Sequence, residues 1–391
     1  MHLAYVVNRF PALSETFVAR EVRAIRERGH RVDVYTFTPP TEAEREAMGD
    51  EMRAMDATTV HVSPGRPSAA DRSRLGAAMS ANARFRHPSS GLGRLGRAFA
   101  LARHLRETPP DRIHAHWPYA TMVTHLASLL TGLPYSVSIH AHEVEHERGH
   151  FPEVFSRLQF ASFCNRAAME RLLGTLPEAA RERSHLVYHG VEVDRFTPLP
   201  MPTSVEPFRV LSAGRLTETK GFDRLVRACA LARDRGAPVD LAILGQGDHE
   251  PAIRAAAEST GFTDHLAMPG WVPHGEVRDW LERSYVFALT ASVGFHDGLP
   301  NVVLEAMASA RPVVLSPLPA ASEAVTPGVE GEILRSEHDV DGLAEILVRL
   351  ASDPEAVRAM GQAARARAEA DHDADREIER LIALHESTAR G

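Results

Sequence analysis

Residues 294–315 read GFHDGLPNVVLEAMASARPVVL, and this stretch decides the fold. Gly298 and Pro300 predict a loop, because both residue types interrupt regular structure. A helix is expected next, with Pro300 in its first turn, Asn301 helping to cap it and an apolar face at helical spacing. After Pro312, residues 313–315 form a run of apolar residues that predicts a short buried strand. Loop, helix and strand in this order are the repeating unit of a parallel α/β sheet.

The same alternation extends to both sides of this stretch. It predicts an α/β protein with two doubly wound, Rossmann-like domains. Four prolines in 197–207 predict a linker. The expected domains are therefore 1–196 and 208–371, with 372–391 as a helix that crosses back to the first domain. Predicted strands are 2–8, 31–37, 58–62, 111–115, 135–139, 160–163, 185–188, 208–213, 239–244, 285–290 and 313–315.

Composition narrows the class of protein. The 391 residues are 44% hydrophobic and 25% charged, as in ordinary globular proteins, and the net charge of −8 argues against a general nucleic-acid binder. The first residues lack a secretory pattern, and no apolar run reaches the roughly 18 residues of a membrane span. Cys164 and Cys229 are the only cysteines, which fits a reducing compartment. A cytoplasmic location is expected.

Two stretches carry chemistry suited to a phosphorylated ligand. Asp297 and Glu305 bracket a helix start, where backbone N–H groups attract anions and carboxylates can bind hydroxyls. After the predicted strand 208–213 comes GRLTETKG, which contains Arg215 and Lys220. Lys220 is the only lysine in the chain, so its place in a glycine-bounded loop is conspicuous.

These phrases together resemble glycosyltransferase family 4, retaining sugar-nucleotide transferases with the GT-B fold, in which two Rossmann-like domains face a cleft. The resemblance implies that Glu305 binds the ribose hydroxyls and that Asp297, where the family has Glu, contacts the transferred sugar. It implies that Arg215 and Lys220 neutralise the donor diphosphate. With these cations in place no metal or other cofactor is expected.

The resemblance extends to further positions on both domains. His140 directly follows a predicted strand and matches a family histidine close to the transferred sugar. The phrase FPALSETF at 10–17 resembles the colanic-acid type of family 4 and makes Glu15 and Thr16 acceptor-side candidates. His116 lies in a His-Ala-His phrase that resembles one lining the family's interdomain cleft, and it is a further acceptor-side candidate. The remaining donor-binding candidates are Gly214, Gly245, Val272, Gly298, Leu299, Asn301 and Val302.

The expected reaction is transfer of a sugar from a UDP- or GDP-linked donor to an acceptor hydroxyl with retained configuration. Polysaccharide or glycoconjugate assembly is the expected context. Two alternatives use related folds. A non-catalytic sugar-nucleotide binder would bind the donor without turnover, and a sugar phosphorylase would need a cofactor lysine besides Lys220.

A different alternative is a zinc hydrolase. His142-Glu143-Val144-Glu145-His146 matches the H-E-x-x-H pattern, in which two histidines on one helix face bind zinc beside a general base. The 21 histidines of the chain make a chance match common, and the segment follows a strand in a polar loop region. The pattern is therefore a minor hypothesis.

Residues 66–106 form a basic segment with nine arginines and one acid, Asp71. A basic amphipathic segment can contact an anionic membrane surface, as expected for an enzyme with a lipid-linked acceptor at the inner face of a membrane. The alternative is a solvated pair of helices.

Overall fold

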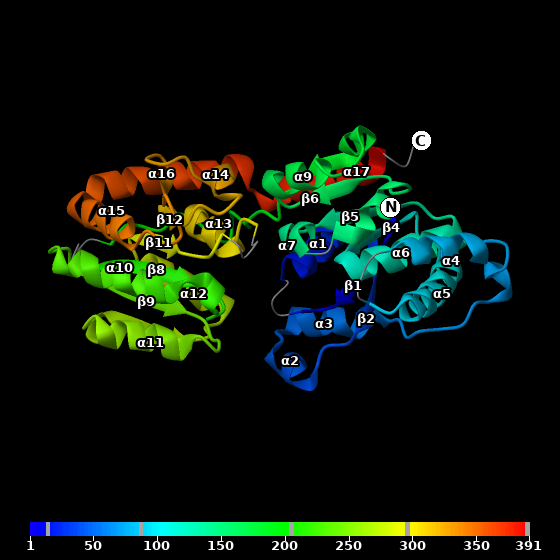
Figure 1. The fold of residues 1–391 in the computed structure, drawn as a ribbon, viewed down its shortest axis with the longest axis horizontal. Helices are drawn as coiled ribbons and strands as arrows, with labels where there is room; N and C mark the ends of the chain where they lie inside the picture. The colour runs from blue at the N-terminus through cyan, green and yellow to red at the C-terminus, as the bar shows by residue number, and fades with distance from the viewer. Residues whose placement is uncertain (13–15, 86–88, 147, 203–206, 294–297, 388–391) are drawn as a thin grey trace. The chain divides into compact units, whose positions relative to one another are not determined.

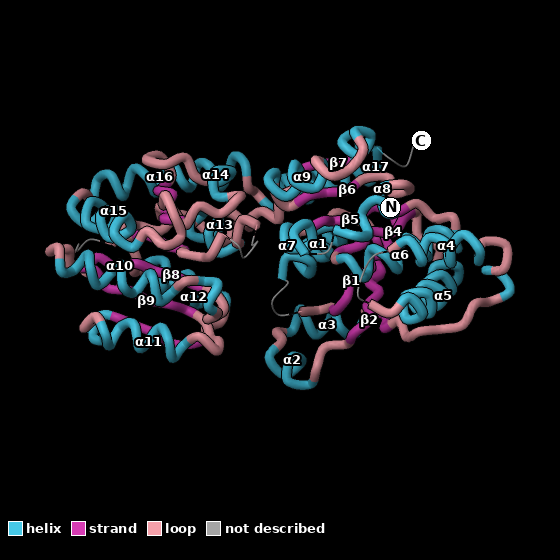
Figure 2. Tube along the Cα trace, viewed as in Figure 1, coloured by secondary structure: helices cyan, strands magenta, loops and turns pink. Residues whose placement is uncertain are grey.

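The computed structural model describes residues 1–12, 16–85, 89–146, 148–202, 207–293 and 298–387. The chain divides into two compact units. The first unit is Met1–Tyr188 joined by the chain from Glu377 onward, and the second is His189–Arg376. Figure 1 traces the elements of each unit, and Figure 2 shows strands lying between helices in both. The predicted fold class, two Rossmann-like α/β domains, is confirmed.

The first unit is built on a parallel sheet of seven strands in the order β3-β2-β1-β4-β5-β6-β7. The first residues of β1 fix its register with both neighbouring strands, since His2 pairs with Arg31 of β2 and Leu3 pairs with Arg112 of β4. The strands are β1 His2–Arg9, β2 Arg31–Thr38, β3 Val60–His61, β4 Arg112–His116, β5 Tyr135–Ile139, β6 Ala161–Phe163 and β7 Ser184–Leu186.

Successive residues of β1 face opposite sides of this sheet, as the two-residue period of a strand requires. Val6 packs in a cluster with α5 and α6, whereas Tyr5 and Val7 pack with α1 and α17. The helices are α1 Thr16–Glu27, α2 Glu42–Ala47, α3 Asp50–Thr58, α4 Leu75–Arg84, α5 Gly91–Glu107, α6 Pro118–Thr131, α7 Ala141–His146, α8 Phe151–Phe155, α9 Arg166–Leu173 and α17 Ala374–Ser387.

The second unit has a parallel sheet of six strands in the order β10-β9-β8-β11-β12-β13. Phe208 and Val210 pack with α10, whereas Leu211 packs with α13 on the other face. The strands are β8 Phe208–Ala213, β9 Val239–Leu244, β10 Leu266–Gly270, β11 Val286–Leu289, β12 Val313–Leu315 and β13 Gly331–Ile333. The helices are α10 Phe222–Asp234, α11 Glu250–Ser259, α12 His274–Glu282, α13 Asn301–Ala308, α14 Ala321–Ala324, α15 Val340–Ser352 and α16 Pro354–Asp371.

The proline-rich segment expected to be a linker is part of the second unit. The buried guanidinium of Arg311 donates hydrogen bonds to the carbonyl oxygens of Leu199, at 3.1 Å, and Pro200, at 2.7 Å. These bonds fix the segment to the sheet beside β12. The chain passes between the two units after Tyr188 and again after Arg376.

Within the described residues, no helix is long and apolar enough to cross a membrane.

Candidate active site

Four neighbouring strands of the second unit end at one edge of its sheet. Because β10, β9, β8 and β11 run parallel, the residues that follow them gather at this edge. Gly214 follows β8, Gly245 is the first residue after β9, and Thr290 follows β11. The chain reverses its direction of travel across the sheet between β8 and β11, and open α/β sheets bind ligands at such points.

The loops after β8 and β9 are tied to each other by backbone hydrogen bonds. The Leu216 N–H donates to the Gln246 carbonyl oxygen at 2.9 Å, and the His249 N–H donates to the Leu216 carbonyl oxygen at 2.9 Å. The two loops therefore behave as one backbone layer at the sheet edge.

Glycines make this close approach possible. A Cβ on Gly245 would lie 1.9 Å from the Gly214 carbonyl oxygen, and one on Gly247 would lie 2.1 Å from the Leu216 carbonyl oxygen. Gly245 also has a φ of +136°, which disfavours other residues. Any side chain at these positions would force the layer apart.

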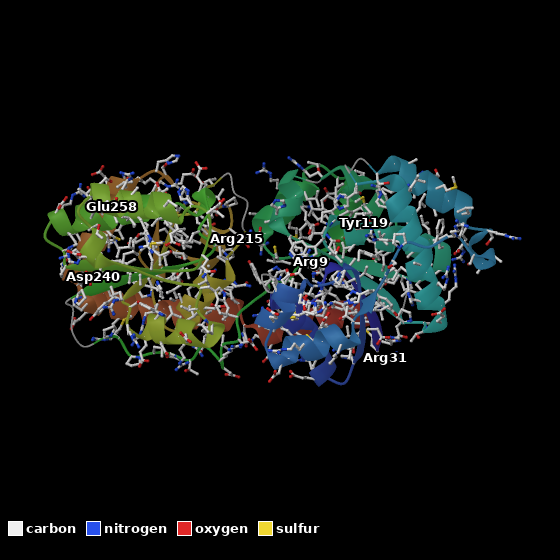
Figure 3. All side chains as sticks on the ribbon, turned by 90° about the horizontal axis from the view of Figure 1, so that it is seen from below. Arg9, Arg31, Tyr119, Arg215, Asp240 and Glu258 are labelled. Atoms are coloured by element: carbon white, nitrogen blue, oxygen red, sulfur yellow. The ribbon has the colours of Figure 1, made fainter. Side chains whose placement is uncertain are left out.

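The two cations predicted to bind the diphosphate lie in the loop after β8. Arg215 is exposed, and Figure 3 shows it at the end of the second unit opposite Asp240, which lies near the amino end of β9. Lys220 is half-buried, and its Cε lies 3.7 Å from the place that a Cβ on Gly214 would take. The lysine side chain thus extends over the first residue of its own loop.

The loop after β11 is held against the loop after β8. The Thr290 hydroxyl donates to the Gly221 carbonyl oxygen at 2.9 Å, and the Ser292 N–H donates to the Thr219 carbonyl oxygen at 2.7 Å. Gly221 has a φ of +63°, and a Cβ there would lie 2.5 Å from the Thr290 carbonyl oxygen. The residues around Lys220 are consequently fixed by both neighbouring loops.

Two residues of this arrangement were missed by the sequence analysis. The Arg224 Nη2 donates to the Thr290 carbonyl oxygen at 2.9 Å and lies 3.4 Å from the Ser292 hydroxyl. The Glu337 carboxylate accepts the Val293 N–H. Arg224 could have been predicted from the sequence, because it lies in the first helical turn after the Lys220-Gly221 pair. Glu337 could not, because no motif lies near it in the sequence.

Helix α13 supplies the other predicted donor residues. Gly298 and Leu299 precede it and are half-buried, Asn301 and Val302 open it, and Glu305 lies one turn further on, half-buried. The expectation that Asn301 helps to cap the helix is wrong, since Asn301 is its first residue. Pro300 occupies the cap position, without a side-chain hydrogen bond among the described residues. Asp297 lies outside the described residues.

Val272 lies just beyond β10, the neighbour of β9. The Gly245 N–H donates to the Gly270 carbonyl oxygen at 2.8 Å, so this segment joins the same backbone layer. Val272 is half-buried, and Trp271 before it has 62% of its surface exposed. An exposed tryptophan beside the loops is unusual and gives the site a fluorescent reporter.

In the first unit, His140 directly follows β5 and is 5% exposed. Its ring stacks on Trp117 with centroids 3.9 Å apart and planes at 27°, and Phe17 lies 5.3 Å from it. His116 ends β4 and is fully buried, with its Nδ1 3.4 Å from the His140 Nε2. The structure therefore brings these two candidates together.

The three residues predicted to face the acceptor differ in what the structure shows of them. Because His116 is fully buried, it offers no edge to an acceptor, and its two ring nitrogens face Glu21 and His140. Glu15 lies outside the described residues. Thr16 is the first residue of α1, and the position of its side chain is likewise outside the description.

The H-E-x-x-H segment is helical, as α7, and not a loop as the sequence analysis expected. Glu143 is nonetheless poorly suited to zinc catalysis. It is 2% exposed, and its carboxylate accepts the His140 backbone N–H at 3.0 Å. His142 is exposed, and the side chain of His146 is outside the description. The carboxylate that a hydrolase would need as general base is thus engaged in starting the helix.

Comparison with known proteins gives a consistent picture. Residues 202–367 match the family model "Glycosyl transferases group 1", and residues 14–202 match "Glycosyl transferase 4-like domain". The amylovoran biosynthesis glycosyltransferase AmsK of Erwinia amylovora is 26% identical over 98% of this chain and 99% of its own. The putative colanic acid biosynthesis glycosyltransferase WcaL of Escherichia coli K12 is 31% identical over 51% of this chain and 49% of its own.

A solved structure shares the fold of the whole chain. The Anabaena protein HepE, crystallised in complex with UDP, superimposes with a TM-score of 0.77 at 17% identity, covering 99% of this chain and 100% of that one. The fold is therefore GT-B, as the sequence predicts. With both family models matched and a relative aligned over almost its full length, the chain belongs to the family 4 glycosyltransferases.

Proposed function

We propose that this glycosyltransferase moves a sugar from a UDP- or GDP-linked donor to an acceptor hydroxyl and retains the configuration of the sugar. The observation that supports it best is the layer of three mutually bonded loops, after β8, β9 and β11, that fixes Arg215 and Lys220 at one sheet edge. Two cations on a rigid backbone suit a diphosphate, because they need not reorganise when the leaving group gains charge.

The cations have separate tasks. The Arg215 guanidinium can contact two phosphate oxygens at once, and the Lys220 ammonium is a compact point charge. The start of α13, at Gly298, Leu299, Asn301 and Val302, adds backbone N–H groups for the same anion. Glu305, one turn into the helix, would accept hydrogen bonds from the ribose hydroxyls, and Val272 would lie along the base.

The chemical step needs no protein nucleophile in this proposal. The bond between the sugar C1 and the diphosphate oxygen breaks, and the acceptor oxygen bonds to C1 on the same face. The acceptor proton passes to the departing phosphate oxygen, which balances the charge. His140 and Asp297 would orient the sugar, and the loop cations would stabilise the leaving diphosphate.

The donor and pathway are proposed from the relatives. The HepE structure holds UDP, which favours a uridine donor, with GDP-linked donors as the alternative. The names of AmsK and WcaL refer to amylovoran and colanic acid, so an exopolysaccharide-type product is proposed. Metal independence belongs to the same proposal, since Arg215 and Lys220 can supply the positive charge.

Peripheral membrane contact, and with it a lipid-linked acceptor, is a further part of this proposal. Leu92 is 83% exposed and Met79 is 54% exposed in the basic segment. The exposed arginines of the basic segment that could contact anionic lipid are Arg66, Arg72, Arg74 and Arg103. Several arginines serve the fold instead: Arg94 is buried, Arg84 pairs with Glu153 and Arg106 with Asp71. The contact surface is therefore smaller than the sequence suggests.

A thermal-shift assay tests the donor site. The wild type, Lys220→Ala and the exposed helix control Arg227→Ala are heated with UDP or GDP in the presence of EDTA. A nucleotide at about 100 times its Kd stabilises by about 2.7 kcal/mol. We expect one nucleotide to stabilise the wild type and the control, and to stabilise Lys220→Ala much less. Equal stabilisation of all three proteins would contradict the role of Lys220.

A further inference from the structure

The sheet of the first unit has its own point at which the chain reverses its direction of travel. The chain runs from β1 outward to β2 and β3, and it then continues on the other side of β1 with β4 and β5. Open α/β sheets bind ligands beside the carboxyl ends of the strands at such a point. Trp117 directly follows β4, so its side chain starts from the edge where a ligand of this unit is expected.

The backbone of Trp117 is strained. Its φ is +74° and its ψ is 150°, a combination that is essentially restricted to glycine because a Cβ clashes with the neighbouring backbone. Strain of this kind persists only where the surroundings impose it, and it is concentrated at binding and catalytic sites. In the part of the chain that the structure describes, Trp117 and Ala310 are the only residues other than glycine with a positive φ. A tryptophan therefore stands where the backbone alone would favour glycine.

Backbone contacts hold the chain in this conformation. The Trp117 carbonyl oxygen accepts the Thr121 N–H at 2.9 Å, a bond that begins α6. The Ala120 N–H donates to the Asn8 Oδ1 at 3.0 Å, which ties the start of α6 to the end of β1. The junction between β4 and α6 thus fixes the direction in which the side chain of residue 117 leaves the sheet.

Two other rings hold the indole plane. The indole stacks on the His140 ring, with centroids 3.9 Å apart and planes at 27°. Phe17, in the first turn of α1, lies edge-on to the indole, with centroids 6.0 Å apart and planes at 68°. His140 is buried, whereas Trp117 is only half-buried, so part of the indole reaches the surface of the unit. Three segments of the first unit therefore fix an aromatic plane at its ligand-binding edge.

A fixed, uncharged aromatic plane is suited to a sugar ring. A pyranose has hydroxyls around its rim and faces that consist of C–H groups, which carry a partial positive charge. The face of an indole is large, apolar and negative, so it attracts such a C–H face. Because the indole is already ordered, little conformational entropy is lost when the sugar binds.

We propose that the indole of Trp117 is the platform on which the acceptor binds, and that the acceptor presents a sugar ring to it. The identification of this sugar as the acceptor rests on the proposed function, which assigns the donor to loops of the second unit. The binding of a sugar ring to Trp117 does not depend on that function.

Saturation-transfer NMR on the full chain without nucleotide tests the platform, with the methyl glycosides of glucose, galactose and mannose as probes. At least one glycoside should receive saturation, most strongly at the C–H protons of one ring face. Trp117→Phe and Trp117→Leu are a matched pair, because both keep a Cβ and an apolar side chain but only Phe has an aromatic face. We expect Trp117→Leu to bind the glycoside about tenfold more weakly than Trp117→Phe does.

Thermal unfolding tests the strain. Trp117→Gly loses the indole contacts as Trp117→Leu does, but glycine adopts the observed φ and ψ freely. Its Tm should therefore equal or exceed that of Trp117→Leu, although glycine ordinarily makes a folded chain less stable. Ala310→Gly, which relieves a φ of +58° in the second unit, is the control and should bind the glycoside as the wild type does. A lower Tm for Trp117→Gly than for Trp117→Leu would contradict the strain on which the proposal depends.

Turnover relates the platform to the acceptor. UDP-glucose is the donor in this assay, and the glycoside that binds is the acceptor. The acceptor KM of Trp117→Leu should be about tenfold higher than that of Trp117→Phe, whereas the donor KM should be equal in the two variants. A defect in folding alone would not separate the two KM values in this way.

The outcomes distinguish the two proposals. Equal glycoside binding by Trp117→Leu and the wild type, equal losses in Trp117→Leu and Trp117→Phe, or a wild type that binds none of the glycosides overturns the platform. Glycoside binding that persists in Trp117→Leu and is lost in Lys220→Ala would assign the sugar to the donor loops and also overturn it. A wild type that binds a glycoside through Trp117 but neither binds nor cleaves a sugar nucleotide contradicts the proposed function alone.

Discussion

The Arg224 guanidinium donates a hydrogen bond to the Thr290 carbonyl oxygen at 2.9 Å, and this bond joins the first helix of the second unit to the loop after β11. Arg224 and Thr290 are 66 positions apart in the chain. The bond holds the loop that leads to α13 next to the loop that contains Lys220. The bond therefore helps to hold Lys220, the predicted diphosphate contact, at a fixed distance from Glu305 of α13, the predicted ribose contact.

Replacement of Arg224 by Met should weaken nucleotide binding without removing any residue that touches the ligand. A hydrogen bond to a charged group contributes about 1.5–3 kcal/mol, so we expect roughly a tenfold increase in the Kd for UDP or GDP. Quenching of the exposed Trp271 gives the Kd. Arg227→Met, on the exposed face of the same helix, is the control, and an equal Kd in both variants would refute the role of Arg224.

Gly245→Ala should separate the loops after β8 and β9. The new Cβ would lie 1.9 Å from the Gly214 carbonyl oxygen, so we expect nucleotide binding to be lost. Gly236→Ala is a matched control, because Gly236 also has a positive φ, +92°, but open space around its Cβ position. The control should be destabilised by about 1 kcal/mol through its backbone alone and still bind nucleotide. Binding by Gly245→Ala at the wild-type level would rule out a rigid layer.

Glu305→Gln tests the predicted ribose contact. The amide keeps the shape of the side chain but loses the charge, so we expect the Kd for the nucleotide to rise about tenfold. A double-mutant cycle with a dideoxy nucleotide, which lacks both ribose hydroxyls, makes the test specific. The substitution should have little effect on binding of the dideoxy form. If both forms lose affinity equally, Glu305 acts elsewhere.

Acid should destabilise the first unit through His125. Burial lowers the pKa of this histidine from 6.5 to about 4, and its Nδ1 lies 2.8 Å from the Tyr135 hydroxyl. Because the folded pKa lies below the unfolded one, the stabilisation is complete above about pH 6.5 and is lost as the pH falls towards 4. Between pH 7 and 5 the loss should be about 2 kcal/mol.

The free energy of unfolding of the first unit, from urea transitions at both pH values, measures this loss. His125→Gln should have a flatter dependence on pH than the wild type, and His61→Gln, at an exposed position, should not. Parallel curves for the wild type and His125→Gln would show that other groups cause the acid effect.

Leu92→Glu should reduce binding to anionic membranes. The substitution removes an exposed apolar side chain and adds a charge of the same sign as the lipid. Flotation with vesicles of equal parts phosphatidylglycerol and phosphatidylcholine is the measurement, and Val329→Glu, at an exposed apolar position in the second unit, is the control. If the wild type does not float with these vesicles, the proposal of membrane contact fails.

The strands that were easiest to predict are those with uninterrupted apolar runs. The bounds of β5, β8, β9 and β12 agree with the sequence-based expectation, because buried parallel strands have such runs between clear breakers. β10 was not predicted, since it contains Pro269 and Gly270 and none of its five residues is fully buried. β13 has only three residues and starts at a glycine.

The site could be predicted only in part for a related reason. Arg215, Lys220 and Glu305 lie in short sequence motifs, and the spacing of residues within these motifs indicates a phosphate- and hydroxyl-binding site. Arg224 and Glu337 act on carbonyl and amide groups of a distant loop, and such contacts follow from tertiary structure alone. The role of Asp297 stays a prediction, since it lies outside the described residues.

Helix α17 has a consequence for the order of events during synthesis. Ile378, Leu381 and Ile382 of α17 complete the core formed by Leu3 and Val22, so the first unit has a gap in its core until α17 has been synthesised. The second unit is complete once Arg376 has left the ribosome. Domains usually mature from the amino end. In this chain the later-made unit can finish folding first, and a nascent chain halted before α17 would expose the apolar residues that this helix covers.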